Sequence, residues 1–110
     1  MKLEFGDGWV KHSGGLLPVA YPVLEARQID GLVVVLYDYM AFPREGPSRN
    51  LFAYNPDGTQ RWRAEDIGQG RVDGYTNIMS EQPLIVGNFS SFTCTIDLRT
   101  GQVLAKEFTK

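Results

Sequence analysis

Apolar and polar residues alternate with a period of two along most of the chain, and this period is typical of β-strands. In Thr59–Glu65, Trp62 and Ala64 fall on one face and two arginines on the other, the pattern of a half-buried strand. Gly31–Tyr39 is apolar on both alternating faces, so we predict a central strand that is covered on both sides. No long window shows a helical period. We therefore predict an all-β, antiparallel fold.

The chain contains two copies of one hairpin pattern. YNPDGTQRW, Tyr54–Trp62, and IDLRTGQVL, Ile96–Leu104, each lead from an apolar residue through Asn or Asp, a glycine turn and Gln to a second apolar residue. Each copy follows two upstream strand-like segments. We predict a single all-β domain over residues 1–110 with two tandem blade-like repeats of three to four strands, repeat 1 at about 21–66 and repeat 2 at about 75–109.

Three segments lie outside this repeated pattern. The opening stretch MKLEFGDGWV alternates as a strand does, with Leu3 and Phe5 on one face, and we predict that it forms an edge strand. Phe42–Asn50 holds two prolines and a glycine, and Gly68–Gly74 holds three glycines, so both are predicted loops. We expect Gly68–Gly74 to be a flexible connection between the repeats. Because the repeats do not share these two loops, we expect function to reside there.

The two hairpins also resemble a known fold. LFAYNPDGTQRWRAE and CTIDLRTGQVLAKEF resemble blade segments of quinoprotein-type β-propellers, and the stretch from Tyr75 onward resembles a group of short uncharacterised bacterial proteins. A propeller closes with roughly 4–8 blades, so two repeats imply an incomplete propeller or a sandwich-like stack. Quinone ligands in those enzymes lie on many blades around a channel, so the resemblance implies no quinone site here. Where such short proteins have a suggested role, it is as partners or antidotes of bacterial toxins.

Charge and hydropathy narrow the range of partners. Eleven Lys and Arg residues against 13 Asp and Glu give a net charge of −2, and the basic residues form no stripe that would neutralise phosphates. We therefore predict no binding to nucleic acid. The longest apolar run, Leu32–Tyr37, is far shorter than the roughly 20 residues of a membrane-spanning helix, and the N-terminus lacks the pattern of a signal peptide. We expect a cytoplasmic protein that does not enter a membrane.

The residues that most resemble catalytic or ligand-binding groups have simpler interpretations. His12 and Ser13 are neighbours on an extended segment, so their side chains point to opposite faces, and no nucleophile elbow is present. GQGRVDG departs from the phosphate-binding spacing, and NPDGT contains only one acidic residue, Asp57, where a calcium loop needs several. Cys94 is expected to be a buried apolar residue. The carboxylates beside the glycine loop are expected to be solvated charges: Glu65, Asp66 and Asp73.

These observations predict a non-enzymatic protein without a cofactor or a metal site. Tyr, Trp and Arg concentrate binding energy at protein interfaces, so we predict that an aromatic and basic set in or beside the two loops contacts a partner: Phe42, Arg44, Arg49 and Tyr75. The leading hypothesis is a protein-interaction module, an antidote that binds a bacterial toxin. The alternatives are a structural homo-oligomer that assembles blades across subunits, and a small-ligand-binding protein.

Overall fold

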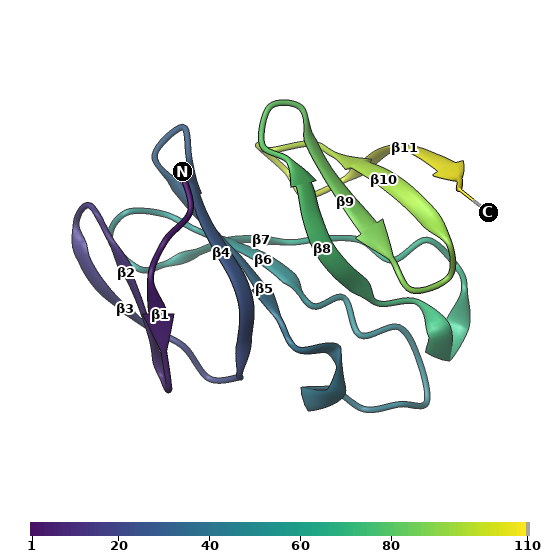
Figure 1. Cartoon of the computed structure of the whole chain (residues 1–110), viewed down its shortest axis with the longest axis horizontal. Coiled ribbons are helices and arrows are strands. Elements are labelled where there is room, and N and C mark those ends of the chain that lie inside the picture. Colours follow the sequence, from purple (N-terminus) through teal and green to yellow (C-terminus); the bar gives the residue numbers. More distant parts are fainter. Residues whose placement is uncertain (110) are drawn as a thin grey trace.

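The computed structural model describes residues 1–109 and consists of three separate antiparallel sheets, none of them closed (Figure 1). The N-terminal sheet has three strands in chain order: β1 Phe5–Gly6, β2 Trp9–His12 and β3 Gly15–Pro18. The middle sheet has four: β4 Val23–Ile29, β5 Leu32–Tyr37, β6 Leu51–Tyr54 and β7 Gln60–Arg63. The C-terminal sheet has four: β8 Tyr75–Ser80, β9 Leu84–Asn88, β10 Phe92–Ile96 and β11 Val103–Phe108. The prediction of an all-β, antiparallel fold is confirmed.

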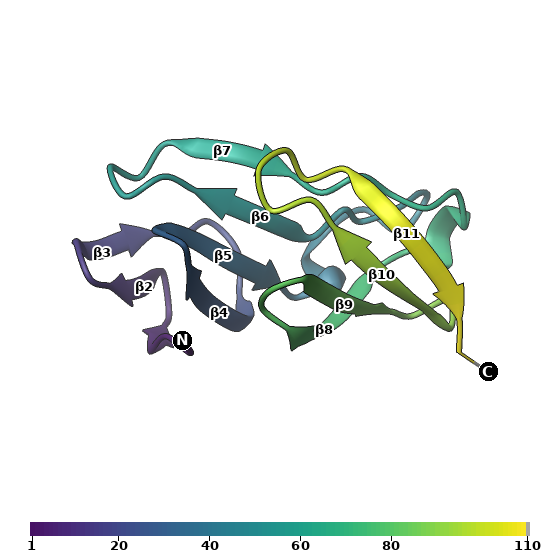
Figure 2. The same cartoon turned by 90° about the horizontal axis from the view of Figure 1, so that it is seen from above.

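The two four-stranded sheets occupy the two predicted repeats. Each is a meander in which neighbours in the chain are neighbours in the sheet, because the connections between strands are hairpins or loops on the same sheet. Seen from above, β4 to β7 and β8 to β11 run in the same order, so that equivalent strands of the two sheets lie beside one another (Figure 2). Two short 3-10 helices interrupt the connections: η1 Tyr39–Ala41 after β5, and η2 Gly70–Val72 before β8.

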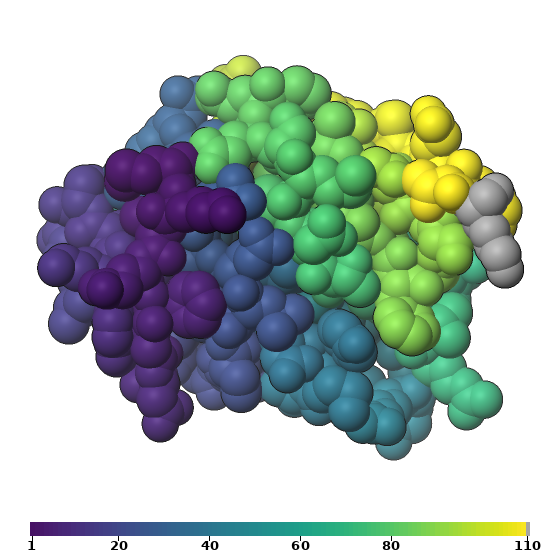
Figure 3. Space-filling model, viewed as in Figure 1, coloured from purple at the N-terminus to yellow at the C-terminus, as the bar shows by residue number. Residues whose placement is uncertain are grey.

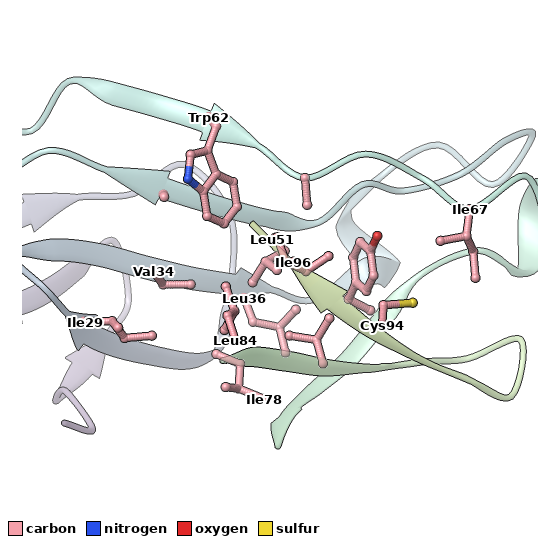
Figure 4. Packing of buried hydrophobic residues seen from close by; sticks show 14 residues of the cluster. Ile29, Val34, Leu36, Leu51, Trp62, Ile67, Ile78, Leu84, Cys94 and Ile96 are labelled. Atoms are coloured by element: carbon pink, nitrogen blue, oxygen red, sulfur yellow. The ribbon is translucent and has the colours of Figure 1, made fainter. Parts of the chain in front are cut away.

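The middle sheet is covered on both faces, as the apolar character of β5 predicts. Val34 and Leu36 face the C-terminal sheet, whereas Val33 and Val35 face the N-terminal sheet, and all four are fully buried. The larger core lies between the middle and C-terminal sheets, where Trp62 from β7 packs over residues such as Leu51, Leu84 and Ile96 (Figure 4). Because the side chains of β5 alternate with a period of two, this one strand contributes to two hydrophobic cores, one on each face of the middle sheet.

The predicted N-terminal edge strand is only partly correct. Lys2 forms one antiparallel bridge with Arg27, and Leu3 donates a backbone hydrogen bond to Ala26 of β4 (2.9 Å), so the first residues do touch the edge of the middle sheet. Beyond them the chain folds into a sheet of its own. The reason is turn chemistry: Gly8 and Gly15 adopt φ angles of 86° and 130°, which glycine tolerates, and the chain reverses twice within a few residues.

The second copy of the repeated hairpin docks on the middle sheet. Gly101 has a φ of 78°, and a Cβ there would lie 2.7 Å from the Trp62 ring. The indole Nε1 of Trp62 donates to the Leu98 carbonyl (2.8 Å), and the Glu65 carboxylate accepts from the Val103 backbone (2.9 Å). Gly58, in the first copy, has a φ of 90°, and a Cβ there would have only one atom of Leu17 near it, at 3.7 Å. The turn of the C-terminal sheet is thus locked against β7, and the two sheets are tied together.

Candidate interaction site

The two loops that the repeats do not share meet at one end of the molecule and form a pocket. The connection from β5 to β6, the connection from β7 to β8 and the turn between β9 and β10 converge there (Figure 1). In the space-filling view their surfaces lie side by side at the lower right (Figure 3). The pocket has a volume of about 350 Å³ and is lined by Tyr39, Met40, Pro43, Arg44, Gly46, Ser48, Arg71, Val72, Asp73, Gly74 and Phe89. We call it the loop pocket.

A buried amide holds the β5–β6 loop in place behind the pocket. The Asn50 side chain is fully buried and sits where the middle sheet meets the C-terminal sheet. Its Nδ2 donates to the backbone oxygens of Tyr37 (2.7 Å) and Tyr75 (2.8 Å), and its Oδ1 accepts from the Tyr75 backbone (2.9 Å) and the Ser48 hydroxyl (3.0 Å). Because an unpaired amide is costly in such a place, this network fixes the loop and both sheets in one arrangement.

A buried carboxylate does the same for the β7–β8 loop. Asp73 is 2% exposed, which corrects the expectation that it is a solvated charge. Its Oδ2 accepts from the backbone amides of Ile67 (2.7 Å) and Gln69 (3.1 Å), and its Oδ1 accepts from Asn88 Nδ2 (2.9 Å). Charge-assisted hydrogen bonds of this kind compensate for burial. The loop expected to be a flexible connection is therefore pinned at one end by its own aspartate.

Large apolar side chains are exposed around the pocket that these networks support. Met40, Val72 and Phe89 are 54%, 47% and 60% exposed. The Phe89 ring packs beside Tyr39, with 5.8 Å between ring centroids. Single exposed apolar residues are common, whereas these three gather around one pocket.

Two arginines add positive charge to the same rim. Arg44 and Arg71 are exposed and line the pocket. Within residues 1–109, ion pairs link only Arg27 and the N-terminal amine to Glu25 and Glu81, so neither rim arginine is paired with a carboxylate. The Arg44 guanidinium lies 3.2 Å from the Met40 sulfur instead. The guanidinium donors of this rim are available to an anionic group from outside.

The structure places the four residues predicted as partner contacts in different environments. Arg44 lies on the pocket rim, and its role in binding stays a prediction. Arg49 adopts a φ of 46° and donates from Nε to the Ala64 carbonyl (3.0 Å), so it straps the loop to the end of β7. Phe42 is 7% exposed and Tyr75 is fully buried, which corrects the expectation that these aromatic rings lie on the surface.

The burial of these two aromatic residues has a clear physical cause. Phe42 packs against Tyr21 and Phe52 in the core shared with the N-terminal sheet, with Arg63 5.4 Å from its ring centroid. Tyr75 begins β8 in the larger core and donates its hydroxyl to the Glu65 carbonyl. Both rings fill space between sheets, and such packing depends on residues distant in the sequence.

The predicted partner contacts do not include four residues that line the pocket: Met40, Arg71, Val72 and Phe89. A signal was present for two of them. Val72 interrupts a run of glycine and polar residues, and Phe89 stands between Asn88 and two serines, so each is an apolar residue in a segment that reads as a turn. An apolar residue in a predicted turn is thus a candidate for exposure on the surface, and both of these residues are exposed.

Of the groups considered for chemistry, Cys94 and His12 lie outside the lining of the loop pocket, whereas Asp73 belongs to it. Cys94 is buried, and burial raises the pKa of its thiol to about 11, which keeps it protonated and poorly nucleophilic near neutral pH. His12 accepts a hydrogen bond at Nδ1 from the Gly14 backbone (3.1 Å) in the N-terminal sheet. Among residues 1–109, no three His, Cys, Asp or Glu side chains are grouped closely enough to hold a metal ion. The same part of the chain contains no helix with the length and apolar character needed to cross a bilayer.

Comparison with known proteins gives a family and a fold. Residues 14–108 match the family described as Domain of unknown function (DUF7957). No curated protein matches the chain significantly. Among solved structures, the crystal structure of the computationally designed Ika8 protein is similar, with a TM-score of 0.60 and 15% sequence identity. The match covers 98% of this chain and 36% of the designed chain, and at this identity it informs the fold alone.

Proposed function

The chain belongs to the DUF7957 family of domains of unknown function, and we propose that it is a non-enzymatic module that binds another protein through the rim of the loop pocket. The observation that carries this proposal is the gathering of Met40, Val72 and Phe89, all exposed, beside two arginines that have no ion pair with residues 1–109. Methionine, aromatic residues and arginine are enriched at protein interfaces, where a few such residues supply most of the binding energy.

The support beneath the rim favours binding over a passive surface. Asn50 and Asp73 hold the two loops through buried hydrogen bonds, so the rim is already ordered before a partner arrives. A preorganised surface loses less conformational entropy on association than a mobile loop does. The Asp73 network also adjoins two of the rim residues, since Asp73 follows Val72 in the chain and accepts a hydrogen bond from Asn88, which precedes Phe89.

For the partner, we propose a bacterial toxin that the module neutralises. This part of the proposal rests on the resemblance of the stretch from Tyr75 onward to short bacterial proteins with that suggested role. A cytoplasmic setting is part of the same proposal. Co-expression with the product of a neighbouring gene tests it, since a toxin–antidote pair forms a complex that survives purification, and absence of a complex at micromolar concentration counts against a toxin partner.

Affinity enrichment with matched variants tests the binding surface itself. We expect Phe89→Ser to remove most of the recovery of a specific partner from cells of the source organism. Leu16→Ser is the matched control, because Leu16 is similarly exposed (64%) but lies on β3 of the N-terminal sheet. Equal recovery with both variants would place the interface elsewhere. Circular dichroism of each variant verifies that the fold is retained.

A structural homo-oligomer is the second candidate. In this interpretation the sheets are successive blades of an incomplete propeller, and copies of the chain continue the series. The supporting observation is β11, an edge strand on which Leu104 and Phe108 are 62% and 58% exposed. Leu104 occupies the position in repeat 2 that Trp62 occupies in repeat 1. Trp62 is covered by the C-terminal sheet. Size-exclusion chromatography with light scattering separates the candidates: a stable oligomer supports the second, and a monomer at micromolar concentration contradicts it.

A further inference from the structure

The loop pocket combines a shape and a charge that together specify the chemistry of its occupant. Its volume of about 350 Å³ lies at the lower end of the roughly 300–1,000 Å³ found for small-molecule pockets. Tyr39 and Pro43 belong to its lining, and the side chain of Phe89 extends the apolar surface onto the rim. The interior therefore suits one large apolar side chain, with further contacts made outside it.

The polar groups of the pocket are unequally satisfied. The Asp73 carboxylate, which is the acidic member of the lining, accepts hydrogen bonds at both oxygens from Ile67, Gln69 and Asn88. Arg44 and Arg71 have no carboxylate partner within residues 1–109. Arg44 and Arg71 are exposed, whereas Asp73 is buried, so the charged groups of the lining that a ligand can reach are cationic.

The positive charge is confined to the mouth of the pocket, and this limits the kinds of ligand that the pocket can bind. The whole chain carries a net charge of −2, and two arginines are too few to track a phosphate backbone. A peptide segment has the required features, because carboxylate side chains or a C-terminal carboxylate alternate with apolar side chains along it. Planar guanidinium groups pair well with carboxylates and pack against apolar and aromatic surfaces.

We propose that the loop pocket binds an acidic segment of the partner protein, with a large apolar side chain seated in the pocket and flanking carboxylates paired with Arg44 and Arg71. This inference rests on the proposed function and adds the chemistry of the partner to it. Binding then weakens as salt concentration rises, because ion pairs at an exposed rim are screened over a Debye length of about 8 Å at physiological ionic strength.

Selection from a library of random peptides displayed on phage, with the full chain as the target, tests the inference. Enriched peptides are then synthesised with a fluorophore, and their binding is measured by fluorescence polarisation. We expect them to combine Asp or Glu with a large apolar residue. The double variant Arg44→Gln/Arg71→Gln is expected to weaken their binding roughly tenfold, as two exposed ion pairs are lost. Arg99→Gln, at an exposed arginine in the second hairpin turn, is expected to leave binding unchanged.

The outcomes separate this inference from the proposed function. If Phe89→Ser abolishes peptide binding while Arg44→Gln/Arg71→Gln has no effect, the pocket is a protein-binding site but the acidic chemistry is wrong. Enrichment of neutral or basic peptides has the same meaning. The inference is overturned if no peptide is enriched. It is also overturned if enriched peptides bind Phe89→Ser and Arg44→Gln/Arg71→Gln as tightly as they bind the unmodified chain. In either case the proposed function loses its main support.

Discussion

Asn50 uses its whole amide group to join strands from two different sheets. Its donors go to Tyr37 on β5 and Tyr75 on β8, and its oxygen accepts from Tyr75 and Ser48. No other side chain type of this size offers two donors and an acceptor in one plane. The residue closes the β5–β6 loop and also positions the start of β8, so the loop pocket and the larger core depend on the same few hydrogen bonds.

We expect Asn50→Ala to lower the free energy of unfolding by about 2–3 kcal/mol, because it leaves buried donors and acceptors on Tyr37 and Tyr75 without partners. Urea unfolding followed by tryptophan fluorescence measures the change. Gln102→Ala is the control, since that side chain is exposed and makes no side-chain hydrogen bond in the described chain, and it is expected to have an effect within about 0.5 kcal/mol. Similar losses for the two variants would mean that the Asn50 network contributes little to stability.

At the scale of elements, the repeated hairpin shows how one sequence pattern serves two packing roles. Both copies contain a glycine with positive φ, although the turns differ by one residue: Gly58 donates to the carbonyl of Asn55, three residues earlier, and Gly101 to that of Asp97, four residues earlier. Only the second turn lies beneath Trp62. In the first copy, a Cβ added to Gly58 would meet Leu17 of the N-terminal sheet at ordinary van der Waals distance. The second hairpin is therefore part of the contact between sheets.

Alanine substitutions at the two turn glycines measure this difference. Gly58→Ala is expected to cost about 1–2 kcal/mol, the strain of a positive φ on a residue with a Cβ atom. Gly101→Ala has the same strain and also places its Cβ 2.7 Å from the Trp62 ring, so we expect a further loss of about 1–3 kcal/mol from overpacking. Urea unfolding of both variants gives the comparison. An equal loss for the two would show that Trp62 yields without cost.

The sequence predicts these elements well where the signal is local. The period of two identifies β5 and β7, and the glycine turns identify both repeated hairpins, because strand pattern and turn chemistry reside in consecutive residues. The separate N-terminal sheet was missed, since its strands are very short and their alternation continues into a pattern that one longer strand also fits. Which strand pairs with which edge is decided by contacts between distant residues, and the sequence pattern carries little of that information.

At the scale of the whole molecule, the three sheets follow one another along the chain, and loops that connect different pairs of strands converge at one end. The sequence indicates both loops as the place of function, and the structure brings them together around one pocket. The exposed residues differ from the predicted ones. Phe42 and Tyr75 belong to the core, whereas Met40, Val72 and Phe89 are exposed. An aromatic residue near a loop has the same signature in the sequence whether it packs inward or outward, so burial had to come from the three-dimensional arrangement.

Site-specific photo-crosslinking in cells of the source organism tests directly whether the loop pocket contacts a specific protein, as we propose. Benzoylphenylalanine replaces Phe89 in one variant and Leu16 in the other, two positions with similar exposure on different sheets. We predict that irradiation joins position 89 to one defined partner, identified by mass spectrometry, and that position 16 gives no adduct with that protein. The absence of a defined adduct at position 89, or the same adduct from both positions, would contradict the claim.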